Sequence, residues 1–596
     1  MNCPKLVGSA VLAAVLSVPL ALAQTQTGPP LGFITKLGQD IDVRSGARIV
    51  ADDNVVGNLI LPELADGPGG GSVVPQIQLR GGNVQVNDPA QTSIQIFPGF
   101  RPFVRATRSE VSTAAFGRNI VVAYNNSTGI HVSPNGPGLI IDRVMLSGYS
   151  TSNDGGSTFS SAFMPPSSSG ATTNGDPSIG VDRHGNFYFA NLASDAIHGT
   201  IQVNTSTDGG KTFGPGVVVQ EDDNSDKDWL AVGPDPVVKQ RDNVYVTWTS
   251  FQPAACELRL GRSTDGGATF TAKTIFVPTA DPNPTHPQNC LTGSNPVVDQ
   301  ITGSLYIPFL RFSNANQDFI QMLISDDAGE TFHFATFNIP GAPDPTVMPV
   351  TQPGELTECG ATRVGNGFLV DLRLTIHTAL NPGPGITGLP RYTEASRLIP
   401  QPALAARNGT LYLAWSNSTS RFYGDPNGRS NILFMRSNDA GKSWSAPIIV
   451  YPILSDKHHV LPAIAIDENP NSVHITYYTQ QNDDSVALDM ANSHDGGNTF
   501  PEDRTLRVSS ESFHLPPTNI PIPTTSNRFA ATNYDRQIAV CYALGEYQDV
   551  TTANGTVYGG WGDTRNQITE PVNALDPISG QTHSQDDVFF QKVKAQ

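Results

Sequence analysis

The chain has 596 residues, of which 38% are hydrophobic and only 15% charged, with 56 glycines and 47 prolines. Such a composition is typical of a globular protein with many short strands and tight turns. The net charge of −18 disfavours nucleic acid as a partner, and beyond the N-terminus no stretch approaches the roughly 18 apolar residues that span a bilayer.

The N-terminus has the pattern of a secretory signal peptide. Lys5 precedes an apolar run over residues 6–22, and small residues lead to an expected cleavage site after Ala23. The alternative is a membrane anchor, which the short run and the lack of a polybasic stretch after it disfavour. We therefore expect residues 1–23 to be removed from a protein that is secreted, or periplasmic in a Gram-negative bacterium.

The next segments differ in their patterns. Residues 24–82 contain Gly- and Pro-rich stretches and predict an irregular lead-in. Residues 83–97 (NVQVNDPAQTSIQIF) contain apolar residues at strand spacing and predict a strand.

A short motif, S-x-D-x-G-x-[ST]-[FW], occurs six times in the rest of the chain. Its aspartates lie 54 to 62 residues apart, except for one gap of 112 residues. Asp can accept hydrogen bonds from turn N–H groups, Gly permits positive φ, and the aromatic residue packs between strands. Six copies cannot all form one active site, so we expect a structural role for Asp154, Asp208, Asp265, Asp327, Asp439 and Asp495.

A longer unit repeats around each motif. Two apolar strands flank a turn, a third strand follows, and the motif leads into a fourth strand; Val244, Val246 and Trp248 show the alternation of a buried strand. Four antiparallel strands per unit are the blade of a β-propeller. The sequence therefore predicts an all-β fold.

We expect seven blades rather than six or eight. Six units carry the motif, and the last one offers strands at residues 536–547, 556–565 and 587–596 without a fourth. Residues 83–97 are expected to supply that strand and close the ring, which leaves no exposed edges. Residues 340–396 are interpreted as an insertion between blades. The propeller would then span residues 83–596.

These motifs and blades resemble the Asp-box (BNR-repeat) proteins, the sialidase-like propellers, over roughly residues 105–596. The resemblance implies the fold, and an active site at the end of the ring opposite the motifs. Asp boxes also occur in other glycoside hydrolases and in non-enzymatic propellers, so any function depends on the site.

Residues just before each first strand, or just after each second strand, should surround that open end. A sialidase-like site would use arginines to hold a carboxylate, for which Arg311, Arg397, Arg528 and Arg565 are candidates, beside Trp229. It would also pair a tyrosine nucleophile with a glutamate, here Tyr534 and Glu110, with Asp176 or Asp228 as acid/base. The family's arginine-hydrophobic-proline signature is absent before the first blade, and each arginine could instead form a structural ion pair.

Four cysteines follow the signal segment. Cys256 precedes a third strand and Cys290 precedes the next blade's first strand, so both belong at the same end of adjacent blades. We expect a disulfide between them. A pairing of Cys359 with Cys541 is left open.

Three functions fit this sequence: a sialidase-like exo-glycosidase for acidic sugars, a lyase or hydrolase of uronate polysaccharides, and a non-catalytic propeller that binds glycans or proteins. In each case we expect a monomer with a carbohydrate or glycoconjugate partner. We expect no cofactor or catalytic metal, although a structural calcium ion is left open.

Overall fold

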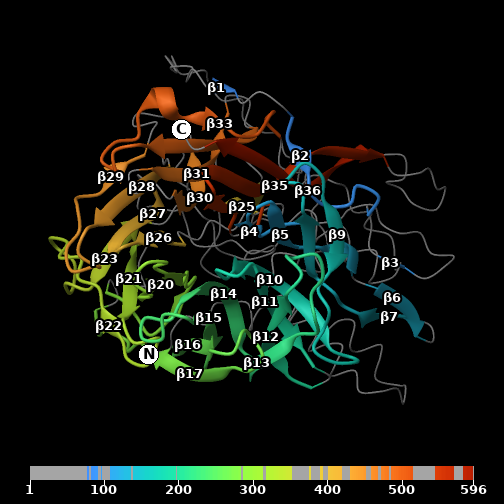
Figure 1. Cartoon of the computed structure of the whole chain (residues 1–596), viewed down its shortest axis with the longest axis horizontal. Coiled ribbons are helices and arrows are strands. Elements are labelled where there is room, and N and C mark those ends of the chain that lie inside the picture. The colour runs from blue at the N-terminus through green and yellow to red at the C-terminus, as the bar shows by residue number, and fades with distance from the viewer. Residues whose placement is uncertain are drawn as a thin grey trace.

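The computed structural model confirms the predicted fold: seven four-stranded antiparallel blades form a ring around a central channel (Figure 1). The helical elements among the described residues are short 3₁₀ turns, such as η1 (Ser127–Gly129) and η3 (Glu502–Arg504). The structure describes residues 77–78, 82–91, 95–96, 108–129, 131–135, 138–195, 197–283, 286–312, 317–351, 375–377, 390–392, 401–418, 430–450, 458–467, 472–481, 485–513, 544–545, 547–569 and 582–594.

The first three blades follow the chain, and the strands of each run in order from the innermost to the outermost. Blade I consists of β4 (Ser112–Phe116), β5 (Asn119–Asn125), β8 (Ser147–Ser152) and β9 (Ser160–Phe163). Blade II consists of β10 (Thr172–Val181), β11 (Phe187–Ser194), β12 (Gly199–Ser206) and β13 (Val217–Glu221). Blade III consists of β14 (Ser225–Pro234), β15 (Asp242–Phe251), β16 (Cys256–Ser263) and β17 (Thr271–Phe276).

Blade IV has divided inner and outer strands. Its central pair is β20 (Leu305–Arg311) and β21 (Gln317–Ser325). The inner edge is shared by β18 (Leu291–Thr292) and β19 (Val297–Val298), and the outer edge by β22 (His333–Phe334) and β23 (Val347–Thr351). Residues 347–351 therefore belong to this blade, although the sequence had suggested an insertion from residue 340. Beyond it, β24 (Thr375–His377) pairs with β25 (Pro390–Tyr392).

Blades V and VI again follow the chain. Blade V consists of β26 (Ala403–Arg407), β27 (Thr410–Ser418), β28 (Ser430–Ser437) and β29 (Ile448–Ile449). Blade VI consists of β30 (His459–Ile466), β31 (Val473–Gln480), β32 (Val486–Ser493) and β33 (Leu506–Arg507), with β1 (Ile77–Gln78) added in parallel outside β33.

Blade VII combines strands from distant parts of the chain. It consists of β34 (Asp549–Ala553), β35 (Thr556–Thr569), β36 (Thr582–Lys594) and, outermost, β2 (Val84–Gln85), which pairs antiparallel with β36. Its innermost strand thus begins after the segment 536–547 that we had expected to form it. A separate sheet joins β3 (Gln95–Ile96) to the hairpin of β6 (His131–Asn135) and β7 (Gly138–Arg143).

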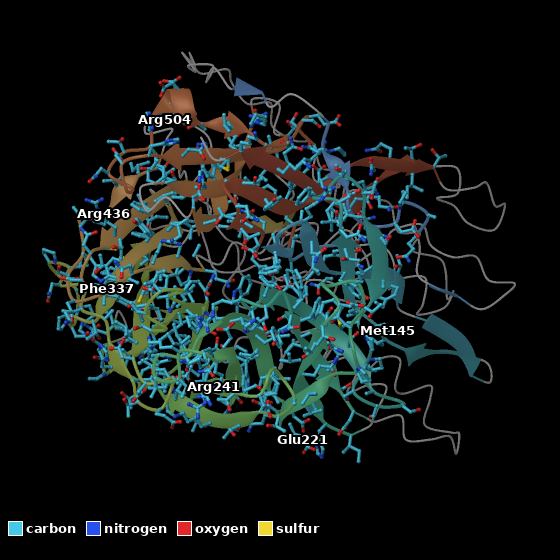
Figure 2. All side chains as sticks on the ribbon, in the orientation of Figure 1. Met145, Glu221, Arg241, Phe337, Arg436 and Arg504 are labelled. Atoms are coloured by element: carbon cyan, nitrogen blue, oxygen red, sulfur yellow. A yellow bond between two sulfur atoms is a disulfide. The ribbon has the colours of Figure 1, made fainter. Side chains whose placement is uncertain are left out.

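Large apolar side chains fill the space between neighbouring blades. Trp248, Trp415 and Trp561 lie on the second strands of blades III, V and VII, and all three are almost completely buried. The alternating pattern that predicts these strands arises because each blade packs one face on each neighbour. Figure 2 shows side chains throughout the ring, with Arg241, Phe337 and Arg436 toward its rim.

The six Asp boxes form turns of one geometry. In the box of blade III, Ser263 Oγ donates to Asp265 Oδ1 at 2.7 Å, and Thr269 Oγ1 donates to Oδ2 at 2.6 Å. Hydrogen bonds from Thr269 lower the pKa of Asp265 to about 2. The carboxylate is thus committed to holding its own turn, which is the structural role we had expected.

The structure contains the expected disulfide, Cys256–Cys290, which joins β16 of blade III to the residue before β18 of blade IV. Its loop spans a sequence separation of 34 residues. Replacing both cysteines with serine should lower the free energy of unfolding by about 2–4 kcal/mol, because the unfolded chain regains the entropy of the open loop. Chemical denaturation under oxidising conditions would measure this; an unchanged midpoint would contradict it.

Candidate functional site

The two ends of the ring are chemically different. At one end lie the Asp boxes and the turns between first and second strands, where Gly155 N of a box donates to Arg118 O at 3.0 Å. At the other end, which we call the mouth, the links between blades enter the innermost strands, and the disulfide joins the link before β18 to the start of β16. The boxes therefore lie away from the mouth.

A distortion recurs where the chain enters the innermost strands at the mouth. Glu110, Asp176 and Lys227, in blades I to III, all have positive φ, between 52° and 56°. Blade VI has Leu461 at the corresponding point, and blade IV has Gly293 with a φ of 62°. In blades II, III and VI this residue lies at a register shift between the first two strands. Non-Gly residues in this region carry strain, which concentrates at functional sites.

The three charged residues of this set meet in one buried cluster. Lys227 Nζ lies 3.5 Å from Glu110 Oε1 and 3.9 Å from Asp176 Oδ2. Asn125 fixes both acids, since its Nδ2 donates to Glu110 Oε2 at 2.7 Å and its Oδ1 accepts from Asp176 N at 3.1 Å. Gly545 makes room for the glutamate: a Cβ there would lie 2.3 Å from Glu110 Cγ.

Burial raises the pKa of two acids at this cluster, Asp176 and Asp228. The pKa of Asp176 is raised well above its ordinary value by burial, opposed by Lys227 and reinforced by the carboxylate of Glu110. Burial also raises the pKa of Asp228 well above its ordinary value, and neither of its carboxyl oxygens has a hydrogen-bond partner among the described residues. A carboxyl group that keeps its proton near neutral pH can act as a general acid.

Two aromatic rings connect the cluster to the channel. Trp229 packs edge-on against Tyr547 with ring centroids 4.7 Å apart, and Lys227 Nζ lies 5.5 Å from the centre of the Tyr547 ring. The Tyr547 hydroxyl donates to Pro177 O at 3.1 Å, which holds the ring between blades. Trp229 is only half-buried, whereas Glu110 and Asp176 are fully buried.

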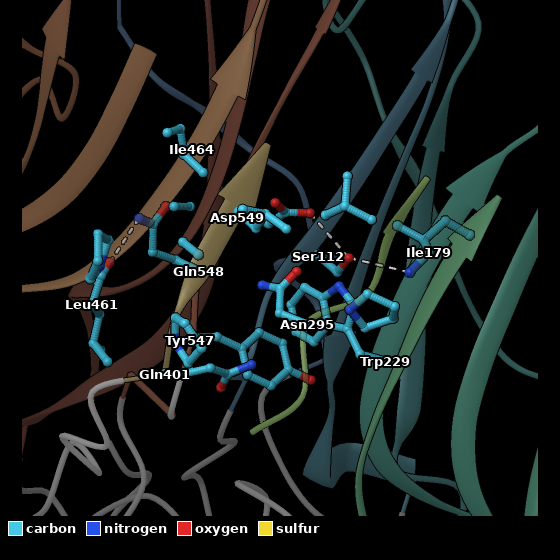
Figure 3. Close-up of a pocket in the computed structure, with 17 residues that line it drawn as sticks. Ser112, Ile179, Trp229, Asn295, Gln401, Leu461, Ile464, Tyr547, Gln548 and Asp549 are labelled. Atoms are coloured by element: carbon cyan, nitrogen blue, oxygen red, sulfur yellow. Dashed lines mark hydrogen bonds between the residues drawn. The ribbon is translucent and has the colours of Figure 1, made fainter. Parts of the chain in front are cut away.

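Below the two rings lies a pocket in the channel, with a volume of about 150 Å³ (Figure 3). Every blade contributes to its wall through the residues of its innermost strand or those just before it. The polar side chains among them are Ser112, Asn295, Gln401, Gln548 and Asp549.

Asp549 titrates in an unusual range. Ser112 Oγ and Thr113 N donate to its Oδ2 at 3.2 and 2.9 Å, yet burial raises its pKa to about 6. Because the folded pKa exceeds the unfolded value of about 3.9, the folded state binds the proton more tightly, so this group makes the free energy of unfolding fall by about 2 kcal/mol as pH rises from 4 through 6. Denaturation between pH 4 and 7 should show this slope, and Asp549→Asn should remove it; a slope unchanged in that variant would contradict the assignment.

The structure brings some of the candidate residues together and separates others. Glu110, Asp176, Asp228 and Trp229 lie at the mouth around Lys227. The candidates Arg397, Arg528 and Tyr534 lie outside the described residues, as do Cys359 and Cys541.

The two described candidate arginines are engaged by protein groups. Arg311 Nη2 donates to Gln288 O at 2.5 Å, and its Nη1 donates to Gln321 Oε1 at 3.1 Å. Arg565 pairs with Asp563, its Nε donating to Oδ2 at 3.0 Å. The structural ion pair considered for this arginine from the sequence is therefore present, and both guanidinium groups have partners within the fold.

Sequence reasoning gave no role to several residues of the site. The rule that residues at the start of each innermost strand reach the mouth also applies to Tyr547, which precedes β34, and to Lys227 near the start of β14. Asn125 ends a second strand and Gln401 precedes β26, so the same rule could have included them.

Within the described ranges, no group of three or more His, Cys, Asp or Glu side chains is arranged to hold a metal ion. Nor does that part of the chain contain a helix with the length and apolar character needed to cross a membrane.

No family model matches this sequence, and no curated protein matches it. Solved structures give distant likenesses. A protein of unknown function from Dyadobacter fermentans is 11% identical, with a TM-score of 0.37 over 72% of this chain and 97% of that one. A Hadza microbial sialidase is 13% identical, with a TM-score of 0.35 over 76% of this chain and 75% of that one. An ulvan lyase of a polysaccharide lyase family is 9% identical, with a TM-score of 0.44 over 83% of this chain and 95% of that one. The fold assignment rests on the strand pairing of this chain.

Proposed function

We propose that this protein is a secreted, carbohydrate-active propeller that binds a glycan at its mouth and transfers protons to it from the buried acids around Lys227. The observation that carries the proposal is the contact of the Glu110–Lys227–Asp176 cluster with the aromatic pair at the channel. Cleavage of a glycosidic bond uses carboxyl groups in two protonation states. Ligand pockets combine aromatic walls with a few such polar groups.

Within this class we propose a sialidase-like exo-glycosidase that acts on acidic sugars. Asp228 or Asp176 would act as the acid, and Glu110 as the partner of a tyrosine such as Tyr534. Arg311 and Arg565 are engaged elsewhere, so Arg397 and Arg528 would have to hold the sugar carboxylate. A lyase or hydrolase of uronate polysaccharides would use the same groups and differs from it in the substrate that is turned over.

A second candidate is a non-catalytic propeller that binds glycans. It is favoured by the engagement of Arg311 and Arg565, which leaves the described part of the mouth without an arginine clamp. It would bind the glycan with the same aromatic pair and would not transfer protons to it.

The test is turnover of a fluorogenic sialoside and of a panel of polyuronates. We expect turnover of at least one of them, and Asp228→Asn should lower its rate by about 100-fold because the general acid is lost. Asp503→Asn, at an exposed aspartate of η3, is the matched control. Full activity of the Asp228 variant would place the chemistry elsewhere. Glycan binding without any turnover would establish the non-catalytic candidate.

Export is a separate part of the proposal. It is supported by the signal-like pattern up to Ala23 and by the Cys256–Cys290 disulfide, since disulfides persist mainly in oxidising compartments. N-terminal sequencing of the exported protein should begin at Gln24; a first residue of Met1 would contradict cleavage.

A further inference from the structure

We infer that the channel pocket below Trp229 and Tyr547 is a subsite for one uncharged sugar ring that offers hydroxyl or amide N–H donors. The inference rests on the proposed function and states which part of the glycan enters the channel. An acidic group of the same glycan would remain outside the pocket, at the mouth.

The size of the pocket suits a single ring. Its volume of about 150 Å³ corresponds to about five water molecules at about 30 Å³ each. All seven blades contribute to the wall, and the half-buried Trp229 and the Tyr547 ring form one side of it (Figure 3).

Gln401 supplies an unused hydrogen-bond acceptor. Its side chain lines the pocket and is 8% exposed, and its Oε1 has no hydrogen-bond partner among the described residues. A buried acceptor left unsatisfied is unfavourable for the fold. A ligand hydroxyl or N–H in the pocket would satisfy it. Figure 3 shows Gln401 among the residues that line the pocket, together with Tyr547 and Trp229.

The charge of the wall determines which ligands fit. Among the described residues that line the pocket, Asp549 is the one charged group, and none of them is a lysine or an arginine. A sugar carboxylate inside the pocket would face this carboxylate without a compensating cation among these described lining residues. Hydroxyl and N–H groups would instead donate to Gln401 Oε1 and to the Asp549 carboxylate.

The test is binding of four monosaccharides to the full chain at pH 7.5: glucose, galactose, N-acetylglucosamine and glucuronate. Saturation-transfer NMR and calorimetric titration would measure the affinities. At least one neutral sugar should bind, and glucuronate should compete for its site at least tenfold more weakly than a second neutral sugar does. Gln401→Leu should weaken binding of the neutral sugar at least tenfold, whereas Gln240→Leu, at an exposed glutamine near the box end, should leave it unchanged.

A second variant keeps the test decisive if Gln401→Leu does not fold. Asp549→Asn removes the negative charge, so it should reduce the discrimination against glucuronate. The inference is overturned if no neutral sugar binds, if glucuronate competes for the site of the neutral sugar as well as a second neutral sugar does, or if both variants behave as wild type. It is also overturned if the pocket binds only a cation, tested with calcium chloride.

Turnover of glycans by the same variants separates this inference from the proposed function. If the protein turns over glycans and its Gln401→Leu variant still binds neutral sugars normally, the subsite is refuted and the proposed function is not. Sugar binding that depends on Gln401, in a protein without turnover, would support the subsite and refute catalysis.

Discussion

Replacing Asp587 with alanine is expected to lower the free energy of unfolding by about 3–5 kcal/mol, because the change leaves a buried guanidinium without its counter-charge. Asp587 accepts hydrogen bonds from Arg108 at 2.9 Å, Asn87 at 2.8 Å, Asn566 at 2.6 Å and Gln585 at 3.0 Å. Arg108 is completely buried. These contacts join β36 to the segment after β2 and to the start of blade I. Chemical denaturation at pH 7 would measure the loss.

The matched control is an exposed ion pair. Arg262 Nη2 lies 2.6 Å from Glu330 Oε1, but the Glu330 side chain is 58% exposed. Glu330→Ala should therefore lower the free energy of unfolding by less than about 1 kcal/mol. If Asp587→Ala cost no more than this control, the network would not hold the ring closed.

The second large effect is expected at Lys227. Lys227→Met should lower the free energy of unfolding by about 3–5 kcal/mol at pH 8, because Glu110 and Asp176 lose the cation between them. Without it, the folded state keeps the proton on Asp176 at a higher pH than the unfolded chain does, because burial raises the pKa of Asp176 and Lys227 no longer opposes that shift. Stability therefore falls as pH rises above about 4, and the loss should be smaller at pH 5 than at pH 8. Denaturation at both pH values would measure the difference.

Two further variants sharpen this test. Lys239→Met removes a lysine whose Nζ donates to Thr302 O at an exposed site, and it should change stability little at either pH. Combining Lys227→Met with Glu110→Gln removes one of the two uncompensated carboxylates and should recover part of the loss. An equal loss at pH 5 and pH 8 would show that Lys227 acts through packing rather than through charge.

The fold could be predicted because its defining turn recurs along the sequence. Each Asp box fixes a turn through contacts within a few residues, as Ser263, Asp265 and Thr269 do, so a local pattern suffices to recognise it. The limits of the divided blade IV could not be predicted in this way. Its outer edge is completed by residues 347–351, whose pairing with β21 depends on tertiary contacts rather than on a motif.

The site could be predicted only in part. Glu110 reaches the mouth because it lies just before an innermost strand, and Asp176 and Asp228 because they lie near the start of one; the repeat reveals these positions. The engagement of Arg311 could not be predicted, because its partner is the backbone carbonyl of Gln288, on the link before its own blade. The pairing of Arg565 with Asp563, two residues away, could be predicted and was weighed against a binding role.

Blade VII can form only after strand β36 has been synthesised, long after its partner strand β2. Asn87, just after β2, bonds to Asp587, 500 residues later in the chain. At ribosomal rates of about 5–20 residues per second, β2 waits roughly 25–100 s before its partner strand exists. During that interval the growing chain has an unpaired strand edge that can join a neighbouring chain. Factors that shield nascent strands should therefore raise the yield of this protein more than its final stability would suggest.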